Sequence, residues 1–486
     1  MSPTGPCNAP DGVDVVALGE SMVTFLPTRP GRLADVPSFE RGIGGAESNV
    51  ACALAAAGHR VRWISRVGAD GFGDHLVEAI GRYGVDVASV RRDPGRPTGV
   101  YFRTAADRGT DAHEVAYYRA GSAASAMSVR NVDLDAVRSG RVLHLSGITA
   151  ALSEGCLGLL RELLAAGGDD RPLVSFDVNY RAGLWRDGDE DGPGVLLELA
   201  RRADVVFVGE DEAEEAWGIT GGPEAVRAAL PEPEVLVVKQ GAVGATAFVS
   251  GAGGGGLAAP TRRSHTCHSL APLGWANAPA LQGAAGGPEG SQPAGGSPVR
   301  LGSVDGPSSR GADTGPGGPQ SGGSRPVRPG WADGSTSRGA AGGPGGSQPA
   351  GSRAAGTAPD PKRGGAAPAR VSDPHLRPAL TPGTPRATAF VPSPNVHIAA
   401  ATGAGDAFAA GFLSAALRGL AVREALRHGH LWAAAALTAP GDLATPPSRA
   451  HADRLVALDD VAWEKLRLGP GWTQAAERAD EEVRTS

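Results

Sequence analysis

The sequence has few cysteines and no long apolar run. Its four cysteines are widely spaced, with neither a C-x-x-C pair nor a cysteine and histidine cluster. This pattern does not indicate a disulfide framework or a zinc site, and a reducing cytoplasm fits it best. No stretch of about eighteen apolar residues occurs, and the N-terminus lacks a charged segment followed by an apolar one. We therefore expect a cytoplasmic protein without membrane contact.

Lysine is also scarce, with residues only at positions 239, 362 and 465. A Walker A loop needs lysine directly after glycine, and none of these three lysines has that neighbour, so a P-loop is excluded. The formal net charge is −6 and no basic arm or stripe stands out. Nothing therefore indicates nucleic acid as a partner, and we expect a small molecule instead.

Glycine (73 residues) and proline (39 residues) are abundant and concentrate in one internal stretch. Residues 251–387 are rich in Gly, Pro, Ala and Ser and lack periodic apolar positions, so they offer too little apolar surface to bury. We predict a disordered insertion there. The remaining chain predicts one discontinuous domain, residues 13–250 and 388–468, followed by a flexible tail over 469–486.

Short apolar runs, beginning with Val13 to Leu18, alternate with amphipathic segments through most of this domain. That alternation predicts an α/β fold with a doubly wound, mostly parallel sheet. The pattern changes over residues 98–120. There, the aromatic runs Val100–Arg103 and Val115–Arg119 flank a polar turn. We predict a hairpin that projects from the sheet as a small lid.

A second local signal is the small-residue turn from Thr402 to Asp406, which opens an apolar helix. Unpaired N–H groups and the helix dipole make such a turn an anion site, and Asp406 could deprotonate a hydroxyl while the turn holds a phosphoryl group. From this segment alone, a packed turn with a capping aspartate is about equally compatible. A dinucleotide fingerprint is disfavoured because Phe408 occupies its third glycine position.

Two signatures in this order resemble those of the ribokinase-like, phosphofructokinase-B type carbohydrate kinases. One runs from Gly44 to Asn49, with Gly58 and Gly68 following, and the other is the turn ending at Asp406. Further motifs resemble 2-keto-3-deoxygluconate kinases of that family: Tyr117–Ala123, His144–Ile148, Asp177–Arg181 and Val238–Gly244. The resemblance implies a ribokinase-like three-layer α/β/α fold with a small β lid.

The resemblance also implies an activity and a set of site residues. It implies ATP-dependent phosphorylation of the 6-hydroxyl of 2-keto-3-deoxygluconate, a sugar acid, with Mg²⁺ as cofactor and a homo-oligomer formed through the lid. The implied catalytic residues are Asp406 as base, with Gly403, Ala404 and Gly405 as the anion hole. The implied sugar-acid pocket consists of Gly45, Asn49, Tyr101, Tyr117, Arg119 and Arg181. The implied ATP-binding residues are Lys239, Gly241, Gly244, Gly403 and Gly405.

Two positions depart from the family pattern. Ala400 stands where relatives usually carry an aspartate, so the resemblance does not extend to monovalent-cation activation. The N-x-x-E motif begins here with Gly209 and keeps only Glu212, which we predict as an indirect magnesium contact.

Two alternatives stay open: a ribokinase- or fructokinase-like kinase for a neutral sugar, and a non-catalytic sugar-acid sensor. Arginine binds carboxylates through a planar pair of donors, so Arg119 and Arg181 favour a sugar acid. Without the family, these arginines could equally be solvated charges, and Tyr101 and Tyr117 could simply pack across the hairpin.

Overall fold

The computed structural model describes residues 12–104, 114–165, 171–185, 191–250, 386–400 and 402–474. An eight-stranded sheet forms the centre of this part of the chain, with parallel pairing from β12 through β4 and antiparallel pairing of β12, β13 and β14. In sheet order its strands are β14 (Arg386–Pro392), β13 (Gly244–Ser250), β12 (Val235–Lys239), β11 (Val205–Gly209), β10 (Leu173–Asp177), β9 (Gly140–Ser146), β1 (Val13–Leu18) and β4 (Val61–Ile64).

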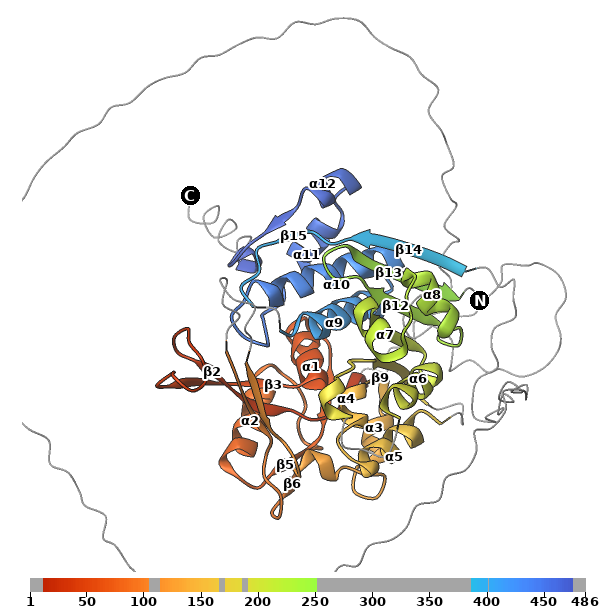
Figure 1. Cartoon of the computed structure of the whole chain (residues 1–486). Coiled ribbons are helices and arrows are strands. Elements are labelled where there is room, and N and C mark those ends of the chain that lie inside the picture. Colours follow the sequence, from red (N-terminus) through yellow and green to blue (C-terminus); the bar gives the residue numbers. More distant parts are fainter. Residues whose placement is uncertain are drawn as a thin grey trace, which may run out of the picture. The chain divides into compact units, whose positions relative to one another are not determined.

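Side chains of the sheet alternate between two apolar clusters, one on each face. In β1, Val15 and Ala17 join one cluster, whereas Val16 and Leu18 join the other. The first face is covered by α1 (Ala46–Ala56), α2 (Gly71–Arg82), α9 (Ala404–Leu417), α10 (Val422–Leu437), α11 (Arg449–Val456) and α12 (Asp460–Glu464). The second is covered by α3 (Leu134–Arg138), α4 (Gly147–Ala150), α5 (Glu154–Leu163), α6 (Gly192–Arg202), α7 (Glu210–Trp217) and α8 (Gly222–Ala229). The predicted three-layer α/β/α fold is confirmed (Figure 1).

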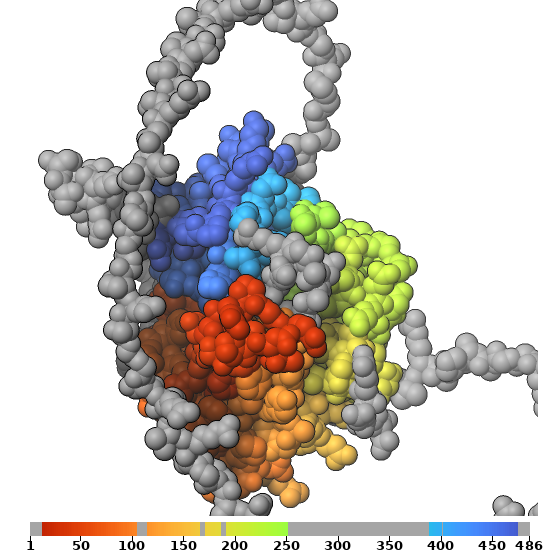
Figure 2. All heavy atoms as spheres, turned by 60° about the vertical axis from the view of Figure 1, so that its left-hand side comes forward, coloured from red at the N-terminus to blue at the C-terminus, as the bar shows by residue number. Residues whose placement is uncertain are grey.

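The lid is larger than the predicted hairpin. Strands β7 (Val100–Arg103) and β8 (Val115–Tyr118) form that hairpin, and its turn, residues 105–113, lies outside the described residues. The hairpin extends a sheet that also contains β2 (Met22–Pro27) and β3 (Phe39–Gly44). The sequence pattern missed both strands. In particular, β3 carries charges and glycines and follows a ragged polar stretch. Figure 2 shows the N-terminal segment in red next to the C-terminal part in blue.

Several short elements complete the described chain. Two small parallel sheets pair β5 (Arg66–Gly68) with β6 (Arg91–Asp93) and β15 (Asn395–Val396) with β16 (Arg467–Leu468), and 3-10 helices span Ala124–Ala126, Ala182–Leu184 and Trp472–Gln474. Trp472 is buried against the core, so packed structure reaches into the predicted tail, whose residues 475–486 lie outside the described range. No described helix has the length and apolarity needed to span a bilayer.

Strands β13 and β14 flank the predicted insertion, of which residues 251–385 lie outside the described range. The two strands are antiparallel neighbours, and Ser250 is paired with Arg386. The second strand therefore begins slightly before residue 388, where we expected the domain to resume. This pairing brings the two ends of the insertion to adjacent positions.

The pairing of Ser250 with Arg386 makes the insertion prediction testable. Replacing residues 251–385 by Asn-Gly should close a two-residue hairpin, because these residues favour the turn that matches strand twist. We expect the shortened protein to unfold cooperatively in denaturant and to keep its catalytic activity. Loss of cooperative unfolding, while the full chain unfolds in one transition, would show that the segment contributes to the core.

Candidate active site

The candidate site lies at the carboxyl end of the parallel strands, where the N-termini of α1 and α9 meet. Open α/β sheets bind ligands at this edge because loops and helix N-termini gather there. Helix α9 begins after Gly403, which has a φ of 77° and therefore favours glycine. A Cβ at Gly403 would also lie 2.2 Å from the carbonyl oxygen of Asp442. Gly403, Ala404 and Gly405 thus form the predicted turn at the positive end of a fourteen-residue helix.

Asp406 lies in the first turn of α9 and is held from the other end of the chain. Asn49, in α1, donates a hydrogen bond from Nδ2 to Oδ2 of Asp406 at 2.8 Å. Burial raises the pKa of Asp406 to about 7. The hydrogen bond from Asn49 opposes this rise, the Asp177 carboxylate adds to it, and nearby Lys239 opposes it. A carboxyl group with this pKa can accept and release a proton near neutral pH.

Lys239 ends β12 and provides a partly buried cation beside the turn. Its Nζ lies 3.2 and 3.1 Å from the two carboxylate oxygens of Asp177, at the end of β10. A Cβ on Gly405 would lie 3.5 Å from the same Nζ, which places the ammonium group next to the turn. Burial alone would lower the pKa of Lys239, but Asp177, Glu212 and Asp406 raise it, so the group stays charged.

The remaining predicted ATP residues lie in and after the loop that follows Lys239. Gly241 has a φ of 56° and its carbonyl accepts a hydrogen bond from the Ser393 hydroxyl at 3.0 Å. Gly244 begins β13, and a Cβ there would lie 2.4 Å from the Val391 carbonyl oxygen. Close packing of β13 on β14 therefore requires glycine at Gly244. The structure thus explains this glycine by strand packing, independently of a nucleotide.

The predicted sugar pocket contains partners that the sequence did not reveal. Arg119 forms a buried ion pair with Glu20, and Glu20 also accepts a 2.6 Å hydrogen bond from the Ser122 hydroxyl. Gly45, at the N-terminal end of α1, lies directly against the backbone of Glu20. Arg119 is therefore a cation whose charge is largely balanced by the protein itself.

The two predicted tyrosines lie on the inner face of the lid. Their rings are 5.4 Å apart, but Tyr101 is buried whereas Tyr117 is 54% exposed. The Tyr101 hydroxyl is hydrogen-bonded to Asp442, whose other carboxylate oxygen lies 2.8 Å from Arg103. Burial, with the Asp442 charge, raises the pKa of Tyr101, which stays a neutral hydroxyl.

Sequence reasoning missed Glu20, Asp442 and Arg103. Glu20 follows the first strand directly, where a carboxylate at the sheet edge could have been suspected. Asp442 follows α10 in a loop without any recognisable spacing, and its role appears only when the lid is folded over it. Arg103 was read as part of the hairpin.

Arg181 and Glu212 lie at the outer side of the site. Arg181 is half exposed, and its Nη1 lies 3.5 Å from Oε1 of Glu212. The other Glu212 oxygen accepts the Gly209 N–H at 2.8 Å and so caps α7. One oxygen of the motif glutamate thus caps its own helix, and the other is paired with Arg181.

Comparison with known proteins identifies the family. Residues 13–266 and 379–449 match the model of the pfkB family of carbohydrate kinases. The chain belongs to the pfkB family. Its members are carbohydrate kinases, so the protein is a phosphotransferase and the non-catalytic sensor is set aside.

Individual relatives of this pfkB kinase carry two substrate names. It is 35% identical over 240 residues to the 2-dehydro-3-deoxygluconokinase of Thermoproteus tenax, covering 49% of this chain and 73% of that one. It is 36% identical over 203 residues to the 2-dehydro-3-deoxygluconokinase of Bacillus subtilis, and this match covers 42% of this chain and 62% of that one. Fructokinase-1 of Oryza sativa is 30% identical over 230 residues, and this match covers 47% of this chain and 70% of that one. The crystal structure of Thermotoga maritima 2-dehydro-3-deoxygluconokinase shares the fold, with a TM-score of 0.57 and 18% identity over 92% of this chain and 99% of that one.

The buried carboxyl group of Asp406 should reduce the stability of this kinase at neutral pH. Its folded pKa of about 7 lies above the ordinary 3.8, so the folded state binds a proton that the unfolded chain releases between these values. Stability therefore falls as pH rises through this window. At pH 8 we expect Asp406→Asn to be more stable than the parent by on the order of 1–4 kcal/mol in urea unfolding, and the difference to vanish near pH 4.

The matched control is Asp135→Asn, the same change at an exposed position in α3. We expect this control to change stability little at either pH. A parent more stable than Asp406→Asn at pH 8 would contradict the burial argument.

Proposed function

We propose that the kinase transfers the γ-phosphoryl group of ATP to the 6-hydroxyl of 2-keto-3-deoxygluconate, giving 2-keto-3-deoxy-6-phosphogluconate. The observation that carries this proposal is Asp406, a partly buried carboxyl group with a pKa of about 7 in the first turn of helix α9, whose N-terminus can hold an anion. Both members of a phosphoryl-transfer site, a base and a cradle for the phosphoryl charge, thus lie within one helical turn.

The reaction follows from this arrangement. Asp406 takes the proton of the 6-hydroxyl, the freed oxygen attacks the γ-phosphorus, and the bond from that phosphorus to the bridging oxygen of ADP breaks. Backbone N–H groups at Ala404 and Gly405 stabilise the charge that develops on the phosphoryl oxygens. The 2.8 Å hydrogen bond from Asn49 fixes the orientation of the Asp406 carboxylate. The proton ends on Asp406 and leaves when the product does.

ATP would place its terminal phosphates against Lys239, with Gly241 and Gly244 in the adjoining loop. The bond to Asp177 holds Lys239 next to Gly405, where its charge complements a phosphoryl group. Mg²⁺ would neutralise phosphate charge when bound. The described residues contain no cluster of three or more potential metal ligands, which suits an ion held mainly by phosphates and water. Oε1 of Glu212, which faces Arg181, is the side-chain contact that we propose for Mg²⁺.

A sugar acid fits the polar groups around Asp406. In this proposal Arg119 and Arg181 provide donors for its carboxylate, and Gly45, Asn49, Tyr101 and Tyr117 form the rest of the sugar pocket. Asp442 adds an acceptor for sugar hydroxyls next to Tyr101. The similarity to the two 2-dehydro-3-deoxygluconokinases supports this substrate, which is the same compound as 2-keto-3-deoxygluconate. Free, buried Cys52 and Cys156 fit the cytoplasmic location that we propose.

A fructokinase-like activity is the second candidate. Glu20 already balances the charge of Arg119, so the pocket attracts a carboxylate less strongly than two free arginines would. The similarity to the rice fructokinase also supports a neutral sugar as substrate. The sugar-acid proposal therefore depends chiefly on Arg181, whose carboxylate partner Glu212 is only a distant one.

The two candidates predict different effects of Arg181→Gln. If Arg181 binds a carboxylate, the variant should lose about 10- to 150-fold in kcat/KM for 2-keto-3-deoxygluconate, since a charged hydrogen bond contributes roughly 1.5–3 kcal/mol. Its effect on fructose should be much smaller. The measurement is a coupled ADP-release assay with both sugars, using Arg130→Gln, at an exposed position outside the site, as the matched control.

A parent enzyme that prefers fructose, or equal losses on both sugars in a correctly folded variant, would favour the neutral-sugar kinase. Arg119→Gln is a weaker test because it leaves Glu20 buried and unpaired. Its thermal unfolding must match that of the parent before its kinetics are interpreted.

We also propose a homo-oligomer formed through the outer face of the lid. Phe25 stacks on Phe102 with ring centroids 4.7 Å apart, and Phe102 meets Tyr118 edge-on at 6.0 Å. Tyr118 is 65% exposed, so this aromatic strip is available to a second copy.

Light scattering after size exclusion tests this interface. We expect the parent to be oligomeric and Tyr118→Asp to be monomeric, because a carboxylate cannot be buried in an aromatic contact without cost. Val461→Asp changes an equally exposed apolar residue in α12 and should leave the oligomer intact. A monomeric parent would contradict the proposal.

A further inference from the structure

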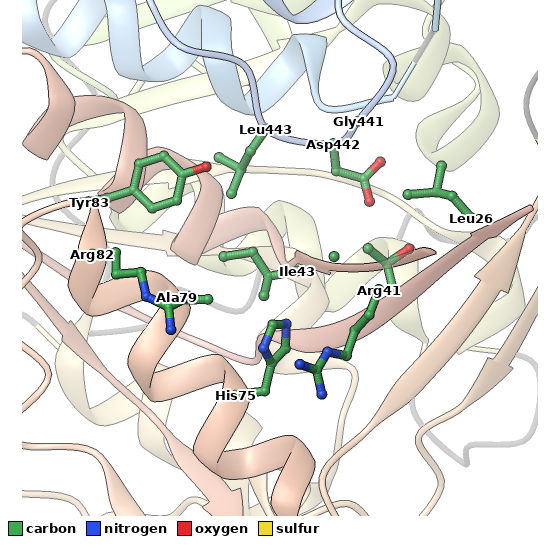
Figure 3. Close-up of a pocket in the computed structure, with 12 residues that line it drawn as sticks. Leu26, Arg41, Ile43, His75, Ala79, Arg82, Tyr83, Gly441, Asp442 and Leu443 are labelled. Atoms are coloured by element: carbon green, nitrogen blue, oxygen red, sulfur yellow. The ribbon is translucent and has the colours of Figure 1, made fainter. Parts of the chain in front are cut away.

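A further cavity lies between the lid and helix α2, and Asp442 is among the residues that line it. It is open to solvent and has a volume of about 460 Å³ between lid strands β2 and β3, helix α2 and the loop around Asp442. In Figure 3, Arg82 and Tyr83 lie at one end, Arg41 and His75 at the other, and Ile43 between them. Neither Asn49, Arg119 nor Asp406 lines it, so it is distinct from the candidate active site.

Three basic side chains face this cavity. Arg41 extends toward the ring of His75 (Figure 3). Burial lowers the pKa of His75, and the charges of Arg41 and Arg82 lower it further, so the ring favours its neutral form. The Nε2 atom of His75 is buried and has no hydrogen-bond partner among the described residues.

The carboxylates around the cavity already have partners within the protein. Asp442 is the one carboxylate among the lining residues, and it is paired with Arg103 at 2.8 Å and hydrogen-bonded to Tyr101. Glu78 pairs with Arg82 at 3.3 Å, but both side chains are about two-thirds exposed, so this pair is weak. Among the described residues no carboxylate lies within ion-pair distance of Arg41. The cavity therefore keeps an excess of positive charge.

The other walls are apolar. Leu26, Ile43, Ala79 and Leu443 line the cavity, and the ring of Tyr83 closes one end. Sites for small molecules commonly have this volume and combine apolar walls with a few directed polar groups. An inorganic ion would satisfy the cations but leave these walls uncovered.

We propose that this cavity binds a small organic anion, a carboxylate or phosphate with an apolar body, through Arg41 and Arg82. The acid group accepts hydrogen bonds from the two guanidinium groups. The apolar body covers the Leu26, Ile43 and Leu443 side chains. Because Asp442 borders both this cavity and the Tyr101 side of the lid, the ligand lies next to the sugar site without entering it.

Isothermal titration of the full chain, without ATP or sugar, tests the proposal. Phenyl phosphate and benzoate are the two probes, and benzyl alcohol is the uncharged control. We expect both acids to bind more tightly than the alcohol, and the tighter of the two identifies the acid group that the site prefers. In the double variant Arg41→Gln/Arg82→Gln, the Kd of the tighter probe should rise about 10-fold or more, as expected for lost charged hydrogen bonds.

The matched control is Arg91→Gln/Arg130→Gln, which removes the same charge at exposed positions away from the cavity. It should bind the probe like the parent. All four substituted arginines are exposed, so we expect both double variants to fold, and thermal unfolding verifies this. Three results would overturn the proposal: no binding of either acid to the parent, equal affinity for benzyl alcohol, or parent-like affinity in Arg41→Gln/Arg82→Gln. Since no catalysis is measured, these results are independent of whether the proposed sugar is correct.

Discussion

The hydrogen bond from Asn49 to Asp406 joins residues that lie 357 positions apart, and the site depends on it. Helices α1 and α9 pack side by side on one face of the sheet, so that both N-termini open toward the same edge. Asn49 orients the carboxylate, and in the proposed reaction the turn at Gly403 would supply N–H groups for a phosphoryl group. Neither Asn49 nor the Asp406 turn forms a site alone. The packing of α1 against α9 brings the two together.

Burial gives the site its chemistry and also imposes a cost. Asp406 is withdrawn from water, which raises its pKa, while Lys239 remains charged because Asp177 lies beside it. A second cation is paired in the same way, because Glu20 balances the charge of Arg119 in the proposed sugar pocket. Isolated buried charges are expensive, so the protein holds its cations in place with fixed carboxylates. A substrate therefore meets groups whose positions are set before it binds.

Local patterns were sufficient to predict the fold class and the turn at Asp406. The short apolar run of β1 and the glycine turn before α9 are properties of short segments, and the structure confirms both. Strand order, the lid strand β3 and the Glu20 partner of Arg119 depend on contacts between distant segments, which no local pattern encodes. Asp442 illustrates this limit best, since it acquires its partners only when the lid packs over the loop after α10.

The central claim is that Asp406 acts as the base with a pKa set by burial. The most direct test is the pH dependence of kcat/KM for the preferred sugar in the parent and in Asp406→Asn. For the parent we predict a rise through an apparent pKa near 7, because only the ionised carboxylate accepts the proton. The variant should be lower by about 100-fold or more at pH 8 and should lack this rise. Parent-like turnover in Asp406→Asn, with the same pH profile, would contradict the account.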